Sequence, residues 1–352
     1  MKFAVLNDTH AGVRNDSIHF HEYMRKFFEE VFFPYCVEND IKHIVHLGDY
    51  FDKRTGINFL SLQRNKEHFI EPLIANGMTM DLILGNHDLY YKNTSEVNSC
   101  EALLKYDNIT IYADTITKDY DGCLITLLPW IHKTNIEDTL EHLELTTSQI
   151  AMGHLEIEGA MMMPGYYSSH GLGFQTFKRF DHVYSGHFHT GSTMQNITYL
   201  GSQMEFTWSD YGDPKGFHIF DTDTREMKKI KNPIRMFEKV FYDDSKLTQE
   251  EILEMDFSNL KDMYVKVIVI NKENPYWFDL FIEKLNKAEV IDFKVVEDHG
   301  NLGDMSDEEM ASDAEDTLTI LTKHIEGMEI SGEKSKLETL IRSLYTEALD
   351  TT

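Results

Sequence analysis

The sequence predicts an α/β fold for residues 1–232, followed by a small α+β module at residues 233–297. Two observations carry this prediction. Short segments rich in β-branched and aromatic residues alternate with longer amphipathic segments in the first part, and the pattern changes after about residue 232. A chain of 352 residues is long enough for one large core with an appended module. Alternation of strand and helix places functional sites at the carboxyl ends of strands.

Segments of the first part are predicted as strands where they are rich in Val, Ile, Leu and Tyr and end at Gly, Asp, Asn or Pro. The expected strands cover residues 3–8, 43–49, 80–88, 109–114, 123–130, 149–156, 182–189, 197–202 and 216–222. Between them, residues 17–38 and 58–76 have apolar residues at helical spacing, and Ser17 is the expected N-cap of the first helix.

The module at 233–297 is expected to contain a strand at 264–270, a helix at 277–288 and a second strand at 290–297. Residues 298–316 follow, with eight acidic residues and neither lysine nor arginine. Such a composition buries too little apolar surface to offset the entropy of ordering, so this segment predicts a flexible linker.

Residues 317–352 predict two amphipathic helices, divided near Ser331 and Gly332. The apolar stripes consist of Leu318, Leu321 and Ile325 in the first helix and of Leu337, Leu340, Ile341, Leu344 and Ala348 in the second. Because the predicted linker separates these helices from any core, the stripes favour a groove on a partner protein.

The charge balance argues against simple binding of a polyanion. The chain has 60 acidic and 33 basic residues, a formal net charge of −27, which repels nucleic acid unless something local reverses it. Bound divalent cations would reverse it at a cluster of carboxylates, and a partner subunit could supply the remaining affinity. Hydrophobic content of 41% is that of an ordinary globular protein, and no apolar run approaches the roughly 18–20 residues of a membrane span.

Cysteine usage favours a reducing compartment. Cys36, Cys100 and Cys123 lie far apart with no metal-type pairing, so they predict buried packing residues and no disulfide framework. The start MKFAVLNDTH carries a charge at residue 8 before an apolar signal region could form, so we expect no secretory signal and a cytoplasmic protein.

Five short motifs stand at the ends of predicted strands and carry side chains that bind metal ions. They are Asp8-Thr9-His10, Gly48-Asp49-Tyr50-Phe51-Asp52, Gly85-Asn86-His87-Asp88, Gly153-His154 and Gly186-His187-Phe188-His189. Aspartate and imidazole are ligands for Mn²⁺, Fe or Zn²⁺, and Asn adds a neutral oxygen. Alternate residues of an extended chain point to the same side, and one carboxylate between two ions can bridge them about 3.5–4 Å apart. Asp49 suits that bridging role.

Each motif alone has an ordinary explanation. A single histidine at a strand end is more often a hydrogen-bonded structural residue than a ligand, and Gly-Asp is common turn chemistry. The five motifs in this order on successive strand ends are what predict a two-metal site. The remaining histidines lack such company and are expected in surface or packing roles.

The order of these motifs resembles the calcineurin-like metallophosphoesterase superfamily over residues 1 to about 220. The G-D-Y-F-D form of the second motif, the chain length and the tail resemble the SbcD-type DNA-repair nucleases, including those that large tailed bacteriophages use in recombination. The resemblance implies a metallophosphoesterase β-sandwich flanked by helices, a capping domain at 233–297 and a C-terminal helical segment that binds a partner.

The resemblance also implies roles for individual residues. One metal site would use Asp8, His10, Asp49 and His189, and the other Asp49, Asn86, His154 and His187. Both ions are expected to be Mn²⁺. His87 would bind no metal; it would approach the phosphate and protonate or stabilise the leaving oxygen after attack by a water activated between the ions, and Asp88 would orient it.

Asp52 departs from some archaeal members, which have a histidine near this place that supports exonuclease action. Two interpretations stay open for Asp52: it braces Arg54, or it braces a ligand histidine.

Basic residues beyond the ligands could contact DNA phosphates: Arg14, Lys53, Arg54 and Lys92, with Tyr90 and Tyr91 available for stacking. The alternative, that these are solvated loop residues, is equally open.

The resemblance implies a partner as well. The terminal helices would bind the coiled coil of an SbcC-type ATPase, and a homodimer is expected through the first long helix with its phenylalanines. Two other functions stay open: a phosphatase or cyclic-nucleotide phosphodiesterase on the same metal core, because a fold does not fix a substrate, and a metal-bearing adaptor of the ATPase complex. The physiological metal, the cleavage polarity and the balance of endonuclease and exonuclease action are not encoded in these patterns.

Overall fold

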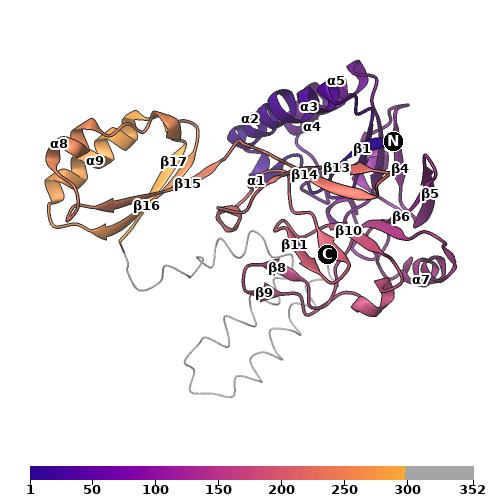
Figure 1. Ribbon diagram of the computed structural model, residues 1–352. Helices are drawn as coiled ribbons and strands as arrows, with labels where there is room; N and C mark the ends of the chain where they lie inside the picture. Colours follow the sequence, from indigo (N-terminus) through magenta and orange to yellow (C-terminus); the bar gives the residue numbers. More distant parts are fainter. Residues whose placement is uncertain (298–352) are drawn as a thin grey trace. The chain divides into compact units, whose positions relative to one another are not determined.

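The computed structural model describes residues 1–297 (Figure 1). Within them, residues 1–206 and 210–295 belong to one unit. The linker predicted at 298–316 and the helices predicted at 317–352 lie outside the described residues. The division into a nuclease domain and a capping domain at residue 232 stays a prediction.

Two six-stranded sheets form the core of the first part. The first has the order β14-β13-β1-β2-β3-β4, and the second has the order β11-β12-β10-β7-β6-β5. Strands β1 to β4 run parallel, and so do β6, β7, β10 and β12. The first sheet comprises β1 (Lys2–Leu6), β2 (His43–His46), β3 (Thr79–Ile83), β4 (Ile109–Tyr112), β13 (Gly216–Asp221) and β14 (Glu226–Lys231). The second comprises β5 (Ile116–Tyr120), β6 (Cys123–Leu128), β7 (Ile150–His154), β10 (His182–Gly186), β11 (Ser192–Met194) and β12 (Ile197–Tyr199).

Apolar residues from both sheets pack into one cluster between them. Phe3 and Val5 of β1 meet Ile125 and Leu127 of β6 there, all of them fully buried. Burial of such side chains is the main favourable contribution to folding. The predicted β-sandwich is therefore confirmed, and each of the expected strands of the first part forms.

Two long helical segments cover the outer face of the first sheet (Figure 1). The first consists of α2 (Ile18–Lys26), a π-helical stretch η1 (Phe27–Phe32) and α3 (Phe33–Glu38). The second consists of α4 (Phe59–Asn65), a π-helical stretch η2 (Lys66–Ile70) and α5 (Glu71–Ala75). Pro34 and Pro72 are each the second residue after a π stretch, where the missing backbone N–H interrupts the regular hydrogen-bond ladder. Ser17 precedes α2 as predicted, but its side chain makes no capping hydrogen bond.

The phenylalanines of the first helical segment are buried in this chain. Phe28 packs on Phe69 with ring centroids 4.8 Å apart, and Phe32 packs on Phe217 of β13 at 5.0 Å. Phe27 and Phe33 are also buried. The expectation that these side chains are exposed for a homodimer was wrong, because they fill the space between the helices and the first sheet.

The remaining short elements connect these layers. They are α1 (Val13–Asp16), η3 (Asn86–Asp88), α6 (Ser99–Leu103), α7 (Ile136–Leu145), β8 (Met161–Met163), β9 (Tyr166–Tyr167), η4 (Phe174–Phe177) and η5 (Trp208–Asp210). Leu143 of α7 packs with Leu128, Ala151 and Val183 on the outer face of the second sheet. Cys36, Cys100 and Cys123 are free and buried, as predicted for packing residues.

The module after β14 has its own core. A three-stranded sheet of β15 (Phe237–Asp243), β16 (Tyr264–Asn271) and β17 (Asp292–Val296) packs on α8 (Gln249–Glu254) and α9 (Pro275–Lys287), with η6 (Ser258–Leu260) between them. Val267, Phe281 and Leu285 are fully buried in this core. The two strands and the helix expected here form; β15 and α8 were not predicted.

One buried carboxylate joins the two sheets away from the strand ends that carry the motifs. Asp81 of β3 accepts hydrogen bonds from His43 (3.0 Å), from Lys118 of β5 (2.6 Å) and from the Tyr120 hydroxyl (2.7 Å). Burial would raise the pKa of Asp81, but these three donors outweigh it and lower the pKa to about 2. Asp81 is therefore ionised under ordinary conditions.

No helix among residues 1–297 is long and apolar enough to cross a membrane.

Candidate metal centre

The seven predicted ligands converge at one edge of the sandwich. Asp8 and His10 follow β1, Asp49 follows β2, and Asn86 follows β3. From the second sheet, His154 ends β7, and His187 and His189 follow β10. Because the carboxyl ends of parallel strands meet at a common edge, both sheets deliver ligand side chains to the same place.

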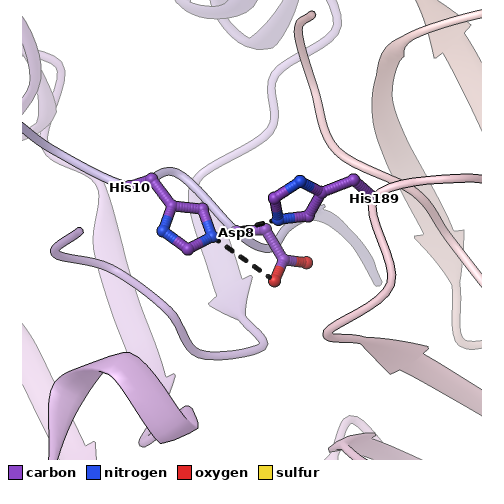
Figure 2. A group of neighbouring side chains, drawn as sticks. All are labelled: Asp8, His10 and His189. Carbon is purple, nitrogen blue, oxygen red and sulfur yellow. Dashed lines mark hydrogen bonds and ion pairs between the residues drawn. The ribbon is translucent and has the colours of Figure 1, made fainter. Parts of the chain in front are cut away.

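The first group consists of Asp8, His10 and His189 (Figure 2). Nε2 of His10 lies 3.1 Å from Nε2 of His189 and 4.0 Å from Oδ1 of Asp8. Figure 2 shows both imidazole rings directed toward each other beside the Asp8 carboxylate. Oδ2 of Asp49 lies 3.8 Å from the same His10 nitrogen.

The second group consists of Asp49, His154 and His187, with Asn86 between the two histidines. Nε2 of His154 lies 3.2 Å from Oδ2 of Asp49 and 2.8 Å from Oδ1 of Asn86. Nδ1 of His187 lies 3.1 Å from the same Asn86 oxygen. Asp49 thus stands next to both groups, which is the position that a bridging carboxylate requires.

These residues fit a pair of divalent cations. His10 and His189 direct nitrogens at each other, and Asn86 directs one oxygen at the nitrogens of two histidines. Atoms that carry lone pairs repel one another at such distances unless a proton or a metal ion lies between them. Imidazole nitrogens together with carboxylate and amide oxygens are the donors that Mn²⁺, Fe and Zn²⁺ accept.

Burial governs the ionisation of the cluster. It raises the pKa of Asp8, which is fully buried. Burial also acts on Asp49 and His154, but their mutual attraction is stronger: the pKa of Asp49 falls well below its ordinary value and that of His154 rises to about 9. Burial lowers the pKa of His189 to about 3, so this imidazole is neutral and can act as a ligand.

Four of the predicted ligands have a left-handed backbone conformation. The φ angles are 50° at Asp8, 46° at His10, 53° at Asp49 and 85° at His187. Such a conformation costs a residue other than glycine about 1–3 kcal/mol and collects at functional sites. Hydrogen bonds between the first two ligand loops offset this cost, from Asp8 N to Gly48 O (3.0 Å) and from His10 N to Asp49 O (3.1 Å).

Two glycines of the motifs permit the close approach of ligand carboxylates. A Cβ atom at Gly85 would lie 2.2 Å from Oδ1 of Asp49, and one at Gly186 would lie 2.9 Å from Oδ2 of Asp8. Any larger residue would displace the carboxylate, so the glycines are part of the geometry of the site.

His87 lies beside the predicted ligands and is only half-buried. Its ring centroid is 4.8 Å from that of His10, and its backbone N–H donates to Oδ1 of Asp49 (2.8 Å). Nδ1 of the His87 ring donates to the main-chain carbonyl of Asp52 at 2.5 Å. Nε2 lies on the opposite side of the ring and is the nitrogen that the predicted acid role requires.

The prediction that Asp88 orients His87 needs correction. The buried Asp88 carboxylate accepts hydrogen bonds from the backbone N–H groups of Gly85 (2.8 Å), Tyr50 (3.0 Å) and Phe51 (3.2 Å). It therefore braces the backbone of the second and third motifs, while the carbonyl of Asp52 holds the His87 ring.

Asp52 lies against a ligand histidine. Its Oδ1 atom is 3.4 Å from Nδ1 of His10, on the side of the ring away from Asp8 and His189. Of the two interpretations left open by the sequence, this geometry favours the bracing of a ligand histidine.

The candidate DNA contacts have different surroundings. Nε of Arg14 donates to the carbonyl of Phe206 (2.9 Å), and Lys53 pairs with Asp16 (3.1 Å). Arg54 is half-buried, and Lys92 is exposed in the loop that carries the exposed Tyr90 and Tyr91. DNA binding by these four basic residues stays a prediction.

Three residues outside the motifs support the ligand histidines. Phe206 packs edge-on against His10 and His189, at centroid distances of 5.6 and 5.3 Å. The Trp130 ring lies 5.1 Å from that of His187. Lys215, almost fully buried, donates to the carbonyl of His189 at 2.7 Å.

Lys215 itself is held by two carboxylates, those of Asp210 and Asp213. No short sequence pattern indicates these supporting residues; only Trp130 stands at the end of a predicted strand.

Comparison with known proteins agrees with the fold. The description of the calcineurin-like phosphoesterase family matches residues 1–191. The chain therefore belongs to the calcineurin-like phosphoesterase family, a class of phosphoric ester hydrolases. Among curated relatives, Exonuclease subunit 1 of Enterobacteria phage T4 is 32% identical over 355 residues, which is 99% of both chains.

More distant relatives and solved structures are also similar. One subunit of the nuclease SbcCD of Staphylococcus saprophyticus is 21% identical over 246 residues, 67% of this chain and 57% of that protein. A dimetal phosphatase from Danio rerio has a TM-score of 0.43 at 12% identity, over 67% of this chain and 97% of that one. An archaeal phosphodiesterase has a TM-score of 0.33 at 14% identity, over 66% of this chain and 100% of that one.

Proposed function

We propose that this protein is a two-metal DNA nuclease that hydrolyses phosphodiester bonds during recombination and double-strand-break repair. The observation that carries the proposal is the convergence of the seven predicted ligands, five of them buried, around Asp49, with the half-buried His87 within ligand distance of His10 and Asp49. The name of the phage T4 relative, an exonuclease subunit similar over the full length of this chain, supports DNA as the substrate.

Two divalent ions at this centre would lower the pKa of an attacking water and neutralise charge on the phosphate. The chain's own residues do the rest. His87 keeps Nδ1 bonded to the Asp52 carbonyl, so Nε2 is the atom that can protonate the leaving oxygen. Its partial exposure leaves it accessible to a phosphodiester.

We take Mn²⁺ as the physiological ion. The ligand groups among the described residues combine carboxylates and imidazoles without a thiolate, a set that manganese accepts.

A partner subunit is part of the proposal. The relatives that share this family are named as subunits of nucleases, and the present chain carries a net charge of −27. An SbcC-type coiled-coil ATPase bound by residues 317–352 would supply affinity for DNA that this acidic chain lacks.

A homodimer is also proposed, with a different surface from the one expected at first. Ile18, Phe59 and Leu60 have exposed fractions of 71%, 88% and 40%. The hydrogen bond from Ser61 Oγ to Asp16 (2.5 Å) ties the start of α4 to the turn before α2, so these three apolar side chains share one region. Isologous contact between two copies would remove them from water.

The direct test is cleavage of linear and circular single-stranded DNA by the full chain with Mn²⁺. His87→Ala and a chelator serve as controls. We expect metal-dependent cleavage that the chelator and the variant abolish. Hydrolysis of a small chromogenic diester without any cleavage of DNA would instead favour a phosphatase or cyclic-nucleotide phosphodiesterase. Wild-type function of the His87→Ala variant in a recombination assay would favour an adaptor.

A further inference from the structure

Asp52 contacts two histidines of different function through two different groups. Its side-chain Oδ1 lies 3.4 Å from Nδ1 of His10, a predicted metal ligand. Its main-chain carbonyl accepts a hydrogen bond of 2.5 Å from Nδ1 of His87, the predicted general acid. The two imidazole rings meet edge to face, with centroids 4.8 Å apart.

Hydrogen bonds that involve neither histidine hold the backbone at Asp52 in place. Its N–H donates to the carbonyl of Ala11 (3.2 Å), and the N–H of Ala11 donates to Tyr50 (2.8 Å). Phe51, the preceding residue, is bonded through its N–H to the buried Asp88 carboxylate (3.2 Å). The loop around Asp52 is therefore rigid enough to set the orientation of the His10 and His87 rings.

We propose that Asp52 is a positioning residue that selects the nitrogen each histidine presents to the site. A neutral imidazole has an N–H at one ring nitrogen and a lone pair at the other. The hydrogen-bond partner of the N–H decides which of the two nitrogens carries the proton. A carboxylate 3.4 Å from Nδ1 of His10 favours the tautomer with its proton on Nδ1, which leaves the lone pair on Nε2, near Asp8, Asp49 and His189. With Nδ1–H of His87 bonded to the carbonyl, the second proton of the imidazolium form sits on Nε2 and is the one that can be transferred to the leaving oxygen.

Mutation can remove one of the two contacts without the other, because the contact with His10 uses the side chain of Asp52 and the contact with His87 uses its main chain. Removal of the carboxylate leaves the carbonyl in place, so it loosens His10 and spares His87. Outer partners of ligand histidines typically contribute about 10–100-fold to metal affinity. This inference rests on the proposed two-metal function and adds a residue to it.

The test is Mn²⁺ titration of the full-length protein by calorimetry, together with the electron paramagnetic resonance signal of free Mn²⁺. The variants are Asp52→Ala, Asp52→Asn and His87→Ala. We expect Asp52→Ala to bind one of the two ions about 10–100-fold more weakly. Asp52→Asn should lose less, since its amide oxygen still places partial negative charge beside Nδ1 of His10. His87→Ala should bind both ions like the wild type.

Nuclease rates complete the test. At saturating Mn²⁺ the kcat of Asp52→Ala should recover to within a few-fold of the wild type, whereas His87→Ala should stay inactive. Equal Mn²⁺ affinity in Asp52→Ala and wild type would overturn the inference, as would a kcat for Asp52→Ala as low as that of His87→Ala. If Asp52→Ala fails to fold by circular dichroism, Asp52→Asn carries the comparison. Failure of the wild type to bind Mn²⁺ would instead reject the proposed function.

Discussion

Nε2 of His154 lies 3.2 Å from the carboxylate of Asp49, although the two residues belong to different sheets. Asp49 follows β2 of the first sheet, and His154 ends β7 of the second. The metal centre is thus also a point where the two halves of the sandwich are held together.

Divalent metal should therefore stabilise the folded protein. A ligand present at 100 times its dissociation constant adds about 2.7 kcal/mol, which raises Tm by about 4 °C in a chain of this size. Thermal unfolding with Mn²⁺ and with a chelator measures the effect. The same Tm under both conditions would show that the seven residues do not hold an ion in the folded state.

Asp49→Asn should lose metal and activity together. The amide has the shape of the carboxylate but not its charge, and the carboxylate stands next to both ligand groups. The loss of metal affinity in Asp49→Asn should exceed the 10–100-fold weakening that is typical when a residue outside the ligand set is removed. Metal content after dialysis and the cleavage rate are the two measurements, and full metal content in this variant would contradict a bridging role for Asp49.

His87→Ala should slow DNA cleavage by about 10²–10⁴-fold, the usual contribution of a general acid. The loss should shrink on a diester with a nitrophenol leaving group, because a weakly basic leaving oxygen needs no proton. Comparison of the rate loss on the two substrates shows whether His87 acts in the protonation of the leaving oxygen. An equal loss on both would argue that His87 acts on the phosphate rather than on the leaving group.

Asp81→Asn should destabilise the protein by about 2 kcal/mol at neutral pH, because charge-assisted hydrogen bonds to a buried carboxylate are lost. The folded pKa of about 2 lies below the ordinary value of 3.8, so the carboxylate stabilises the fold above pH 3.8. That contribution disappears as the pH falls from about 4 through 2, and the gap between variant and wild type should close there.

Denaturant unfolding at several pH values checks the Asp81 prediction. Asp107→Asn, an exposed aspartate on the turn before β4, is the matched control and should change stability little. A pH-independent difference between Asp81→Asn and wild type would mean that the lost stability comes from packing and not from charge.

Phe59→Asp should convert the proposed homodimer into a monomer, because a carboxylate at the centre of an apolar contact stays unpaired. Analytical ultracentrifugation gives the mass. Ile74→Asp, at an apolar side chain of 48% exposed fraction on α5, is the control and should leave the mass unchanged. If the wild type is a monomer, or if Phe59→Asp still forms dimers, the surface of Ile18, Phe59 and Leu60 is not a dimer interface.

The sequence was sufficient for the nine expected strands of residues 1–232 and for the convergence of the motif residues, whose role as ligands stays a prediction. Central strands are short apolar runs that end in turn residues, and parallel strands bring their carboxyl ends together, so the position of Asn86 near His187 followed from pattern alone. The strands β5 and β14 were missed because they lie at sheet edges. Their residues are largely polar, as in Glu226–Lys231 of β14, and an edge strand needs only one apolar face.

Contacts between distant segments could not be predicted. Phe28 was expected to be exposed at a homodimer contact, because helical spacing identifies an apolar face but does not show which residues cover it. Likewise, neither the turn that brings the Asp88 carboxylate to three backbone N–H groups nor the fold that places Lys215 under His189 has a local signature. These contacts depend on three-dimensional proximity between residues far apart in sequence.

The first strand of the chain finds one of its neighbours only much later in the sequence. Lys2 of β1 pairs with Asp221 of β13. During synthesis on the ribosome, β1 therefore waits with one side unpaired until more than 220 residues have emerged. A nascent chain of this kind folds slowly and exposes a strand edge that other chains can join. Rapid overproduction should thus favour aggregation, and slower synthesis at low temperature should raise the yield of folded enzyme.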